Sequence, residues 1–308
     1  MAKVVRGVDD YKKEFLSIFN SLCGRHGRWE VWSDFIQLTA IDISNVTDKG
    51  NAPKRAADAR NIAKKYSEDE IKRMAEMLMQ MVYAIDENPD QDFLGELYMA
   101  CNLGNDHAGQ FFTPYNVCQC MSEITYDVPA LLDGKGFIAV NDPACGAGAL
   151  PLSFANICKR KGINYQEKVL FVAQDIDYTV GLMCYIQLTL MGCAGYVVIG
   201  DTLTNPTTCY DKHGLLPAVK PDRVWYTMMF SNNLWYGRRM AAQMDALLFR
   251  ISESNLQNPA EKVEIEHKIV PKMSKSEKKI AKKAVSITKS EEVETNLNEN
   301  KFGQLTFF

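Results

Sequence analysis

The octapeptide NDPACGAG, at residues 141–148, is the clearest sign of fold class in this chain of 308 residues. It follows an apolar run of strand character at 136–140 and precedes an apolar segment of helical spacing at 150–158. A glycine-rich turn between a buried strand and a helix is typical of open parallel sheets, whose ligands bind beyond the carboxyl ends of the strands. Gly146 and Gly148 let the backbone approach such a ligand closely. The spacing matches neither G-x-G-x-x-G nor a phosphate-binding loop that ends in G-K-[ST].

Strand-like and helical segments alternate after this turn. Strand runs occur at 168–173, 196–199 and 223–230, and helical segments at 178–191 and about 238–250. This alternation predicts right-handed β-α-β units and a parallel, Rossmann-like α/β sheet. After the strand run at 223–230 only one helical segment remains before the composition changes near residue 251. We therefore expect the sheet to be truncated.

Four regions follow from composition. The first hundred residues have helical spacing, and Ser67 with Glu70 forms a capping box. Residues 252–301 hold ten Lys and nine acidic residues but no aromatic residue, which predicts a disordered tether. The predicted regions are a helical N-terminal domain at 1–105, a cofactor-binding domain at 106–251, a tether at 252–302 and a terminal peptide at 303–308.

Charge and cysteine usage exclude several classes of function. Residues 1–251 carry 25 basic and 29 acidic side chains, so contact with nucleic acid must use a local basic face. Nine cysteines without C-x-x-C, and four dispersed histidines, predict reduced thiols in a cytoplasmic protein and no metal site. No apolar run is long enough to cross a membrane. The candidates for phosphate contacts are Arg55, Arg60, Lys64, Lys65, Arg238 and Arg239.

Acidic residues stand at three successive strand ends. Asp142 follows the first predicted strand, Asp175 the second and Asp201 the third. A carboxylate after the second strand can accept both hydroxyls of an adenosine ribose. The alternative is that each acid only caps the helix that follows it. Three acids beside one glycine turn favour a nucleotide-type cofactor site.

Two motifs follow one another along the chain, GQFFTP at 109–114 and then DPACGAG at 142–148. Together they resemble the paired signatures of S-adenosylmethionine-dependent DNA adenine (N-6) methyltransferases. The similarity is greatest to the modification subunit of type I restriction-modification systems and to phage-borne relatives, and it covers about 93–239. It implies S-adenosyl-L-methionine as cofactor and methyl transfer to the exocyclic amino group of adenine in double-stranded DNA.

The resemblance also implies which residues hold the cofactor. Residues 110–115 would surround its methionine end, Asp142 would meet its ammonium group, Asp175 its ribose and Asp201 its adenine edge. Core packing remains the alternative for the two phenylalanines. The full set implied is Gln110, Phe111, Phe112, Thr113, Pro114, Asp142, Ala144, Cys145, Gly146, Asp175 and Asp201.

The catalytic motif of the family, Asx-Pro-Pro-aromatic after the fourth strand, is not matched. At that position Asn232 is the candidate acceptor for the target amine, and Trp235 or Tyr236 the candidate platform for the base. Asn205-Pro206 matches in part but precedes the fourth strand, so we do not assign the catalytic loop to it. Three alternatives stay open: an enzyme with a divergent loop, half of a split enzyme completed by another subunit, and a cofactor-binding protein without transfer activity.

The chain ends in QLTFF, residues 304–308. This peptide resembles those that bacterial replication and repair proteins insert into the sliding clamp. The resemblance implies that Gln304, Leu305, Phe307 and Phe308 contact the clamp. The alternative is that the peptide docks on the sheet of its own chain. A specificity subunit is a further expected partner, because no target-recognition domain is evident.

Overall fold

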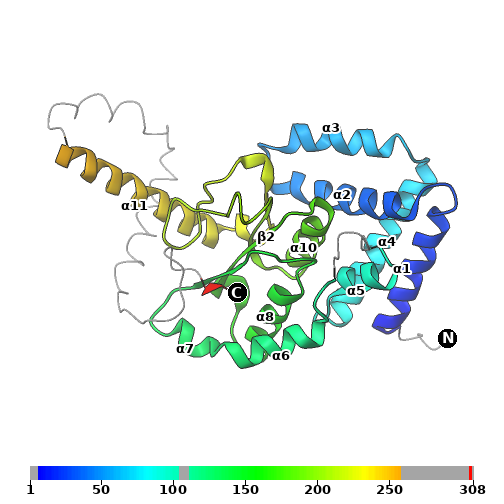
Figure 1. Ribbon diagram of the computed structural model, residues 1–308, viewed down its shortest axis with the longest axis horizontal. Helices are drawn as coiled ribbons and strands as arrows, with labels where there is room; N and C mark the ends of the chain where they lie inside the picture. Colours follow the sequence, from blue (N-terminus) through cyan, green and yellow to red (C-terminus); the bar gives the residue numbers. More distant parts are fainter. Residues whose placement is uncertain (1–5, 104–110, 258–304, 307–308) are drawn as a thin grey trace.

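The computed structural model describes residues 6–103, 111–257 and 305–306. The N-terminal helices gather on one side of a central sheet, and the last helix projects from the other side (Figure 1). The helices before the sheet are α1 (Val8–Leu22), α2 (Arg28–Thr47), α3 (Ala52–Ala63), α4 (Glu68–Glu87), α5 (Phe93–Ala100), α6 (Tyr115–Thr125) and α7 (Val128–Leu132).

Aromatic packing and local caps build the helical part. Phe15 of α1 makes edge contacts with Trp32, Phe35 and Phe93, which come from α2 and α5. At the start of α4 the Ser67 hydroxyl accepts from the Glu70 amide, and the Glu70 carboxylate accepts from the Ser67 amide at 2.7 Å. The predicted capping box is therefore present.

A five-stranded sheet with the order β4-β3-β2-β1-β5 forms the second part. β1, β2 and β3 run parallel, with α8 (Ala149–Arg160) and α9 (Tyr165–Lys168) between the first two and α10 (Tyr178–Leu190) between the last two. This confirms the predicted Rossmann-like α/β fold class. The strands are β1 (Ile138–Asp142), β2 (Val169–Asp175), β3 (Ala194–Ile199), β4 (Val224–Tyr226) and β5 (Leu305–Thr306).

Helix α10 joins the two parts. It is apolar on nearly all sides because it lies between the sheet and α2, and Thr179 through Thr189 are buried. The hydroxyls of Ser33 on α2 and Thr179 on α10 lie 3.1 Å apart. The N-terminal helices therefore pack directly against the helix that follows β2.

The fourth strand differs from the prediction, because β4 pairs antiparallel with β3, as Tyr196 opposite Tyr226 and Val198 opposite Val224. Residues 200–220 contain no helix, and only the short 3-10 turn Pro221–Arg223 precedes β4. Without a crossover helix the chain folds back along β3. The carboxyl end of β4 therefore lies at the amino ends of β1, β2 and β3.

Helix α11 (Asn233–Gln257) begins earlier than predicted and continues past the expected tether boundary at 251/252. No proline interrupts the sequence from Asn233 until Pro259, so the helix has no strong breaker. The rest of the predicted tether, 258–302, lies outside the described residues. Among the helices that are described, none combines the length and apolar character that a membrane crossing requires.

The two described residues of β5 pair parallel with β1 on the side away from β2. Val140 lies opposite Leu305, and Asn141 lies opposite Thr306. This arrangement corresponds to the alternative in which the terminal peptide docks on its own sheet.

Candidate cofactor site and family

The glycine turn connects the carboxyl end of β1 to the first residue of α8. The Cys145 amide donates to the Gln174 carbonyl of β2 at 3.0 Å, which anchors the turn to the neighbouring strand. Gly146 and Gly148 have φ angles of 55° and 100°, a region that favours glycine. A side chain at Gly148 would also lie 3.0 Å from the sulfur of Cys184. The backbone of this turn therefore requires both glycines.

Two carboxylates lie beside the turn. Asp175 accepts hydrogen bonds from the amides of Gly146 and Asp177, each at 2.9 Å. Asp142 is 1% exposed and accepts from the Ala144 amide at 3.2 Å. Burial raises the pKa of Asp142 to about 7, and the charge of Asp175 adds to the effect. Burial also raises the pKa of Asp175.

Neither carboxylate forms an ion pair with a Lys or Arg in the part of the chain that the structure describes. A bound cation or a set of hydroxyl donors would therefore offset the cost of holding the buried Asp142 and the partly buried Asp175 at this position. The site suits a ligand that carries an ammonium group and hydroxyl groups.

The segment before α6 lies over the turn. The Phe112 ring stacks on Tyr98, with centroids 5.1 Å apart, and a side chain at Gly146 would lie 3.4 Å from it. Phe111 is 81% exposed, and Thr113 and Pro114 are exposed as well. Phe112 thus packs on Tyr98 and lies next to the turn at the same time. Gln110 lies outside the described residues.

The buried acid Asp92 links the N-terminal helices to the β1 turn through Gln187. Asp92, at the start of α5, accepts from the Gly95 amide at 2.9 Å and from the Gln187 side-chain amide at 2.7 Å. The same Gln187 nitrogen donates to the Ala147 carbonyl at 2.9 Å. Burial raises the pKa of Asp92. Gln187 therefore connects α5, α10 and the turn.

Of the residues in the turn, Ala144 is exposed and Cys145 is buried. A hydrogen bond with the Cys184 thiol and burial raise the pKa of Cys145 well above its ordinary value. Cys145 is thus a buried, protonated thiol that fills space in the turn.

The loop after β3 reaches the same edge of the sheet. The Asp201 carboxylate accepts from the Leu203 amide and the Thr204 hydroxyl, both at 2.9 Å, and these bonds lower its pKa. The Thr202 hydroxyl donates to the Pro143 carbonyl of the β1 turn. Asp201 therefore shapes its own turn, and that turn contacts the β1 turn.

Three residues at this edge were missed by the sequence analysis. Gln174 donates to the carbonyls of Gly200 and Asn205, each at 3.0 Å, and so holds the loop after β3. Ile176 and Leu203 are 69% and 93% exposed. For Ile176 and Leu203 the sequence offers a signal, a large apolar residue one or two positions after a strand-end acid. Gln174 has no such signal.

The model of the N-6 DNA methylase family matches residues 90–298, more than half of the chain. The chain belongs to the N-6 DNA methylase family. This confirms the resemblance inferred from the two motifs.

This family member is also similar to two solved structures. One is a type I restriction-modification methyltransferase subunit from Streptococcus thermophilus, with 13% identity and a TM-score of 0.38, covering 65% of this chain and 60% of that one. The other is a putative class I S-adenosylmethionine-dependent methyltransferase from Listeria monocytogenes, with 14% identity and a TM-score of 0.33, covering 76% of this chain and 70% of that one. The chain thus spans 60% of the streptococcal subunit's length. No curated protein matched.

In this member of the N-6 DNA methylase family the predicted catalytic residues lie at the opposite edge of the sheet from the β1 turn. Asn232 caps α11, where its side-chain oxygen accepts from the Trp235 amide at 2.9 Å. Trp235 is fully buried, and its ring nitrogen donates at 2.7 Å to the carbonyl of Gln166, just before β2. Tyr236 is half-exposed on the same helix. Because β4 is antiparallel, the structure does not bring these three residues to Asp142 and Asp175.

Several predicted phosphate contacts have structural partners. Arg55 is buried, lies 3.7 Å from the ring centroid of Trp225, and pairs with Asp48 at 2.9 Å. Arg238 lies over Phe137 and Trp235, and burial lowers its pKa to about 10.

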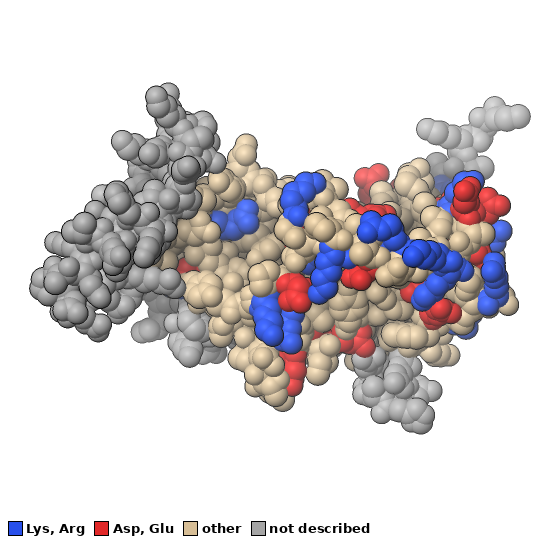
Figure 2. Space-filling view, turned by 90° about the horizontal axis from the view of Figure 1, so that it is seen from above, with Lys and Arg blue, Asp and Glu red and all other residues tan. Residues whose placement is uncertain are grey.

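Arg239 lies over the ring of Phe230, and Lys65 pairs with Glu30 and Asp34. Arg60 and Lys64 are exposed on α3. Figure 2 shows Lys and Arg interspersed with Asp and Glu over the face seen from above.

Proposed function

We propose that this chain binds S-adenosylmethionine at the β1 turn and serves in methyl transfer to the exocyclic amino group of adenine in double-stranded DNA. The observation that carries the proposal is the pair of carboxylates around Gly146, Asp142 buried and Asp175 partly buried, at the carboxyl edge of three parallel strands. Membership of the N-6 DNA methylase family supports the reaction class. We expect the protein to act in the cytoplasm of a bacterium and to be of bacterial or phage origin.

The residues at this edge fit the proposed cofactor. Asp142 would receive its ammonium group, and Asp175 its ribose hydroxyls, beside the bond that Asp175 already accepts from Gly146. Ile176 and Leu203 offer exposed apolar side chains for the adenine ring, close to Asp201. When bound, S-adenosylmethionine supplies a methyl group on a sulfonium. The remaining proposed contacts come from 110–114 and from Ala144, Cys145 and Gly146.

Because the antiparallel β4 puts Asn232 at the other edge of the sheet, we now propose Asn205 in its place as the amide that orients the amine of the target base. Transfer to an exocyclic amine needs a flipped base held by acceptors at the cofactor. What supports Asn205 is its loop: Gln174 holds the Asn205 carbonyl at 3.0 Å, and Thr202 of the same loop contacts Pro143. The Asn205 side chain is exposed and donates to the Thr204 hydroxyl at 2.9 Å.

The test of this function is transfer of a tritiated methyl group to adenine-containing DNA. The proposal predicts label in N6-methyladenine, and loss of that label in Asn205→Ala. Asn232→Ala serves as the matched control, since it changes the same amide at the other edge of the sheet. Cofactor binding without label under any condition would reject the transfer step.

A second candidate is a cofactor-binding chain that needs another subunit for transfer. One observation favours it: among the described residues, the outer side of β1 is paired over two residues alone. The assay separates the candidates when it is run with and without the product of a neighbouring gene. Label that depends on the second protein supports a split enzyme.

We also propose a specificity subunit and the bacterial sliding clamp as partners. Gln304, Phe307 and Phe308 of the proposed clamp peptide lie outside the described residues, whereas Leu305 is paired with β1. Strand pairing and clamp binding would compete for Leu305. Pull-down of the clamp by the full chain, and its loss when 304–308 are deleted, tests this partner. Equal recovery without the peptide would reject it.

A further inference from the structure

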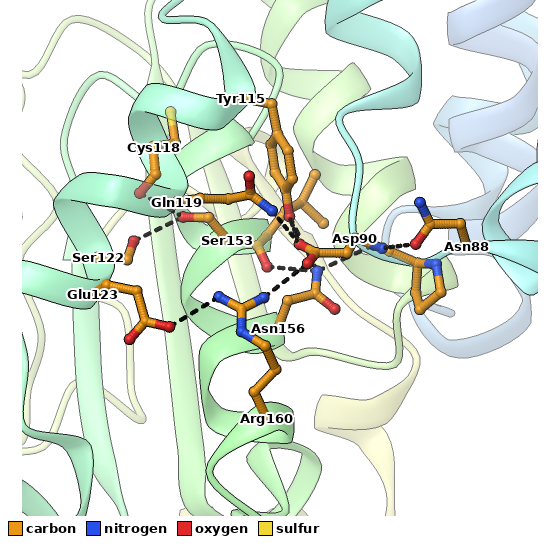
Figure 3. A network of polar contacts seen from close by, with 12 residues as sticks. Asn88, Asp90, Tyr115, Cys118, Gln119, Ser122, Glu123, Ser153, Asn156 and Arg160 are labelled. Carbon is orange, nitrogen blue, oxygen red and sulfur yellow. Dashed lines mark hydrogen bonds and ion pairs between the residues drawn. The ribbon is translucent and has the colours of Figure 1, made fainter.

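A cluster of polar side chains joins three segments that are distant in sequence (Figure 3). One segment is the linker between α4 and α5, another is α6, and the third is α8. We call the cluster the Asp90 network. Its members are Asn88, Asp90, Tyr115, Gln119, Ser122, Glu123, Ser153, Asn156 and Arg160.

Asp90 is the acceptor at the centre. One of its oxygens accepts from the Tyr115 hydroxyl at 2.7 Å and from the Gln119 amide at 3.0 Å. The other accepts from Arg160 at 2.7 Å, and Arg160 also pairs with Glu123 at 3.3 Å. Since Arg160 is partly exposed, its ion pairs contribute less than the buried hydroxyl contact.

Tyr115 is a buried residue of α6 that connects Asp90 with Asn156 of α8. Its hydroxyl donates to Asp90 and accepts from the Asn156 side-chain amide at 3.1 Å. That amide also contacts the carbonyls of Pro89 and Leu152, at 3.1 Å and 3.0 Å. Burial raises the pKa of Tyr115, so the hydroxyl stays protonated and continues to donate. The hydroxyl thus ties the linker, α6 and α8 together at one point.

The two helices in this network each follow a segment of the proposed cofactor site. Helix α6 starts directly after Pro114, and α8 starts directly after Gly148. Ser122 and Ser153 add a second link between the helices, with their hydroxyls 2.7 Å apart. The network therefore fixes how the segment that contains Phe112 lies relative to the turn that contains Gly146.

We propose that Tyr115 is a positioning residue whose hydroxyl, held by Asp90 and Asn156, keeps Phe112 over the Gly146 turn and thereby sets the affinity for the cofactor. This inference rests on the proposed function. Tyr115→Phe isolates the effect, because the ring stays buried, Asp90 keeps Gln119 and Arg160, and Asn156 keeps its two carbonyl contacts.

The matched control is Tyr165→Phe. The Tyr165 hydroxyl also donates one bond, to the Met191 carbonyl at 2.8 Å, but it stands at the amino end of β2, away from the turn. Tyr115→Phe loses the bond donated to Asp90 and the bond accepted from Asn156, whereas Tyr165→Phe loses one donated bond, so a small fall in thermal midpoint is expected for each, somewhat larger for Tyr115→Phe. Only Tyr115→Phe is expected to change the cofactor site.

The experiment measures the dissociation constant of S-adenosylmethionine by calorimetry and amide hydrogen exchange over 111–118 without cofactor. Tyr115→Phe is expected to weaken binding about three- to tenfold, a change in affinity of the size that a typical single hydrogen bond contributes. It should also speed exchange over 111–118, whereas Tyr165→Phe changes neither. Asp90→Asn, which keeps an acceptor for Tyr115, is expected to restore most of the affinity that Asp90→Ala loses.

Wild-type affinity and exchange in Tyr115→Phe would overturn the proposal, and so would equal changes in both tyrosine variants. If the wild-type chain binds no S-adenosylmethionine, the proposed function fails. In that case the exchange over 111–118 decides the positioning role by itself, because it requires no cofactor.

Discussion

Asp142→Asn tests the electrostatics of the turn, because asparagine keeps the shape of the side chain and removes its charge. Burial raises the pKa of Asp142 from 3.8 to about 7, and this difference corresponds to about 4 kcal/mol between its two protonation states. The folded state holds the proton longer than the unfolded state does. The free energy of unfolding of the wild-type protein therefore falls as pH rises from about 4 to about 7.

The asparagine variant lacks this penalty, so its advantage over the wild type should grow with pH. We expect the smallest difference near pH 4, and the advantage of the variant should grow by about 1 to 3 kcal/mol between pH 5 and pH 8, measured by urea unfolding without cofactor. The control is Asp133→Asn, which removes an exposed carboxylate and should show no such trend. An Asp142→Asn difference that is constant between pH 5 and 8, or that becomes less favourable as pH rises, would refute this reasoning.

Three further predictions concern the frame of the site. Arg55→Ala should lower the free energy of unfolding by about 3 to 5 kcal/mol, because it leaves Asp48 as an unpaired, largely buried charge; urea unfolding measures this. Gly148→Ala should cost about 1 kcal/mol or more and weaken cofactor binding in calorimetry, because its φ of 100° and the nearby Cys184 oppose a side chain. Asn232→Ala should cost about 1 kcal/mol as a lost helix cap and leave methyl transfer intact; loss of transfer would return the catalytic role to it.

The glycine turn after β1 could be predicted because its signals are local. A buried strand, a glycine turn and a helix follow one another in the sequence, and Asp142 and Asp175 end neighbouring parallel strands. Parallel pairing then brings the two acids together without further information. The same logic found Asp201, although its carboxylate is used within its own turn.

The position of the candidate catalytic residues could not be predicted, because it depends on strand direction. Asn232 follows a strand-like run in the sequence, and the run does form β4, but its antiparallel pairing puts Asn232 at the far edge. A run of apolar residues carries no sign of direction. An asparagine before a helix also fits a cap as well as it fits an acceptor for an amine.

Gln174 and Gln187 could not be predicted for a related reason. Each has a buried side-chain amide that connects segments distant in the sequence. Gln174 contacts the loop after β3, and Gln187 contacts Asp92 and Ala147. In the sequence they are single polar residues within apolar segments. Only the packed arrangement of the strands and helices shows what they hold.

Photolabelling with radioactive S-adenosylmethionine, followed by peptide mapping, tests the central claim most directly. If the cofactor lies at the carboxyl edge of the sheet, label is expected in peptides that contain 111–114, 142–148 or 175–176, and excess unlabelled cofactor should remove it. Label confined to 230–236, or no competed label at all, would contradict the claim that the β1 turn is the cofactor site.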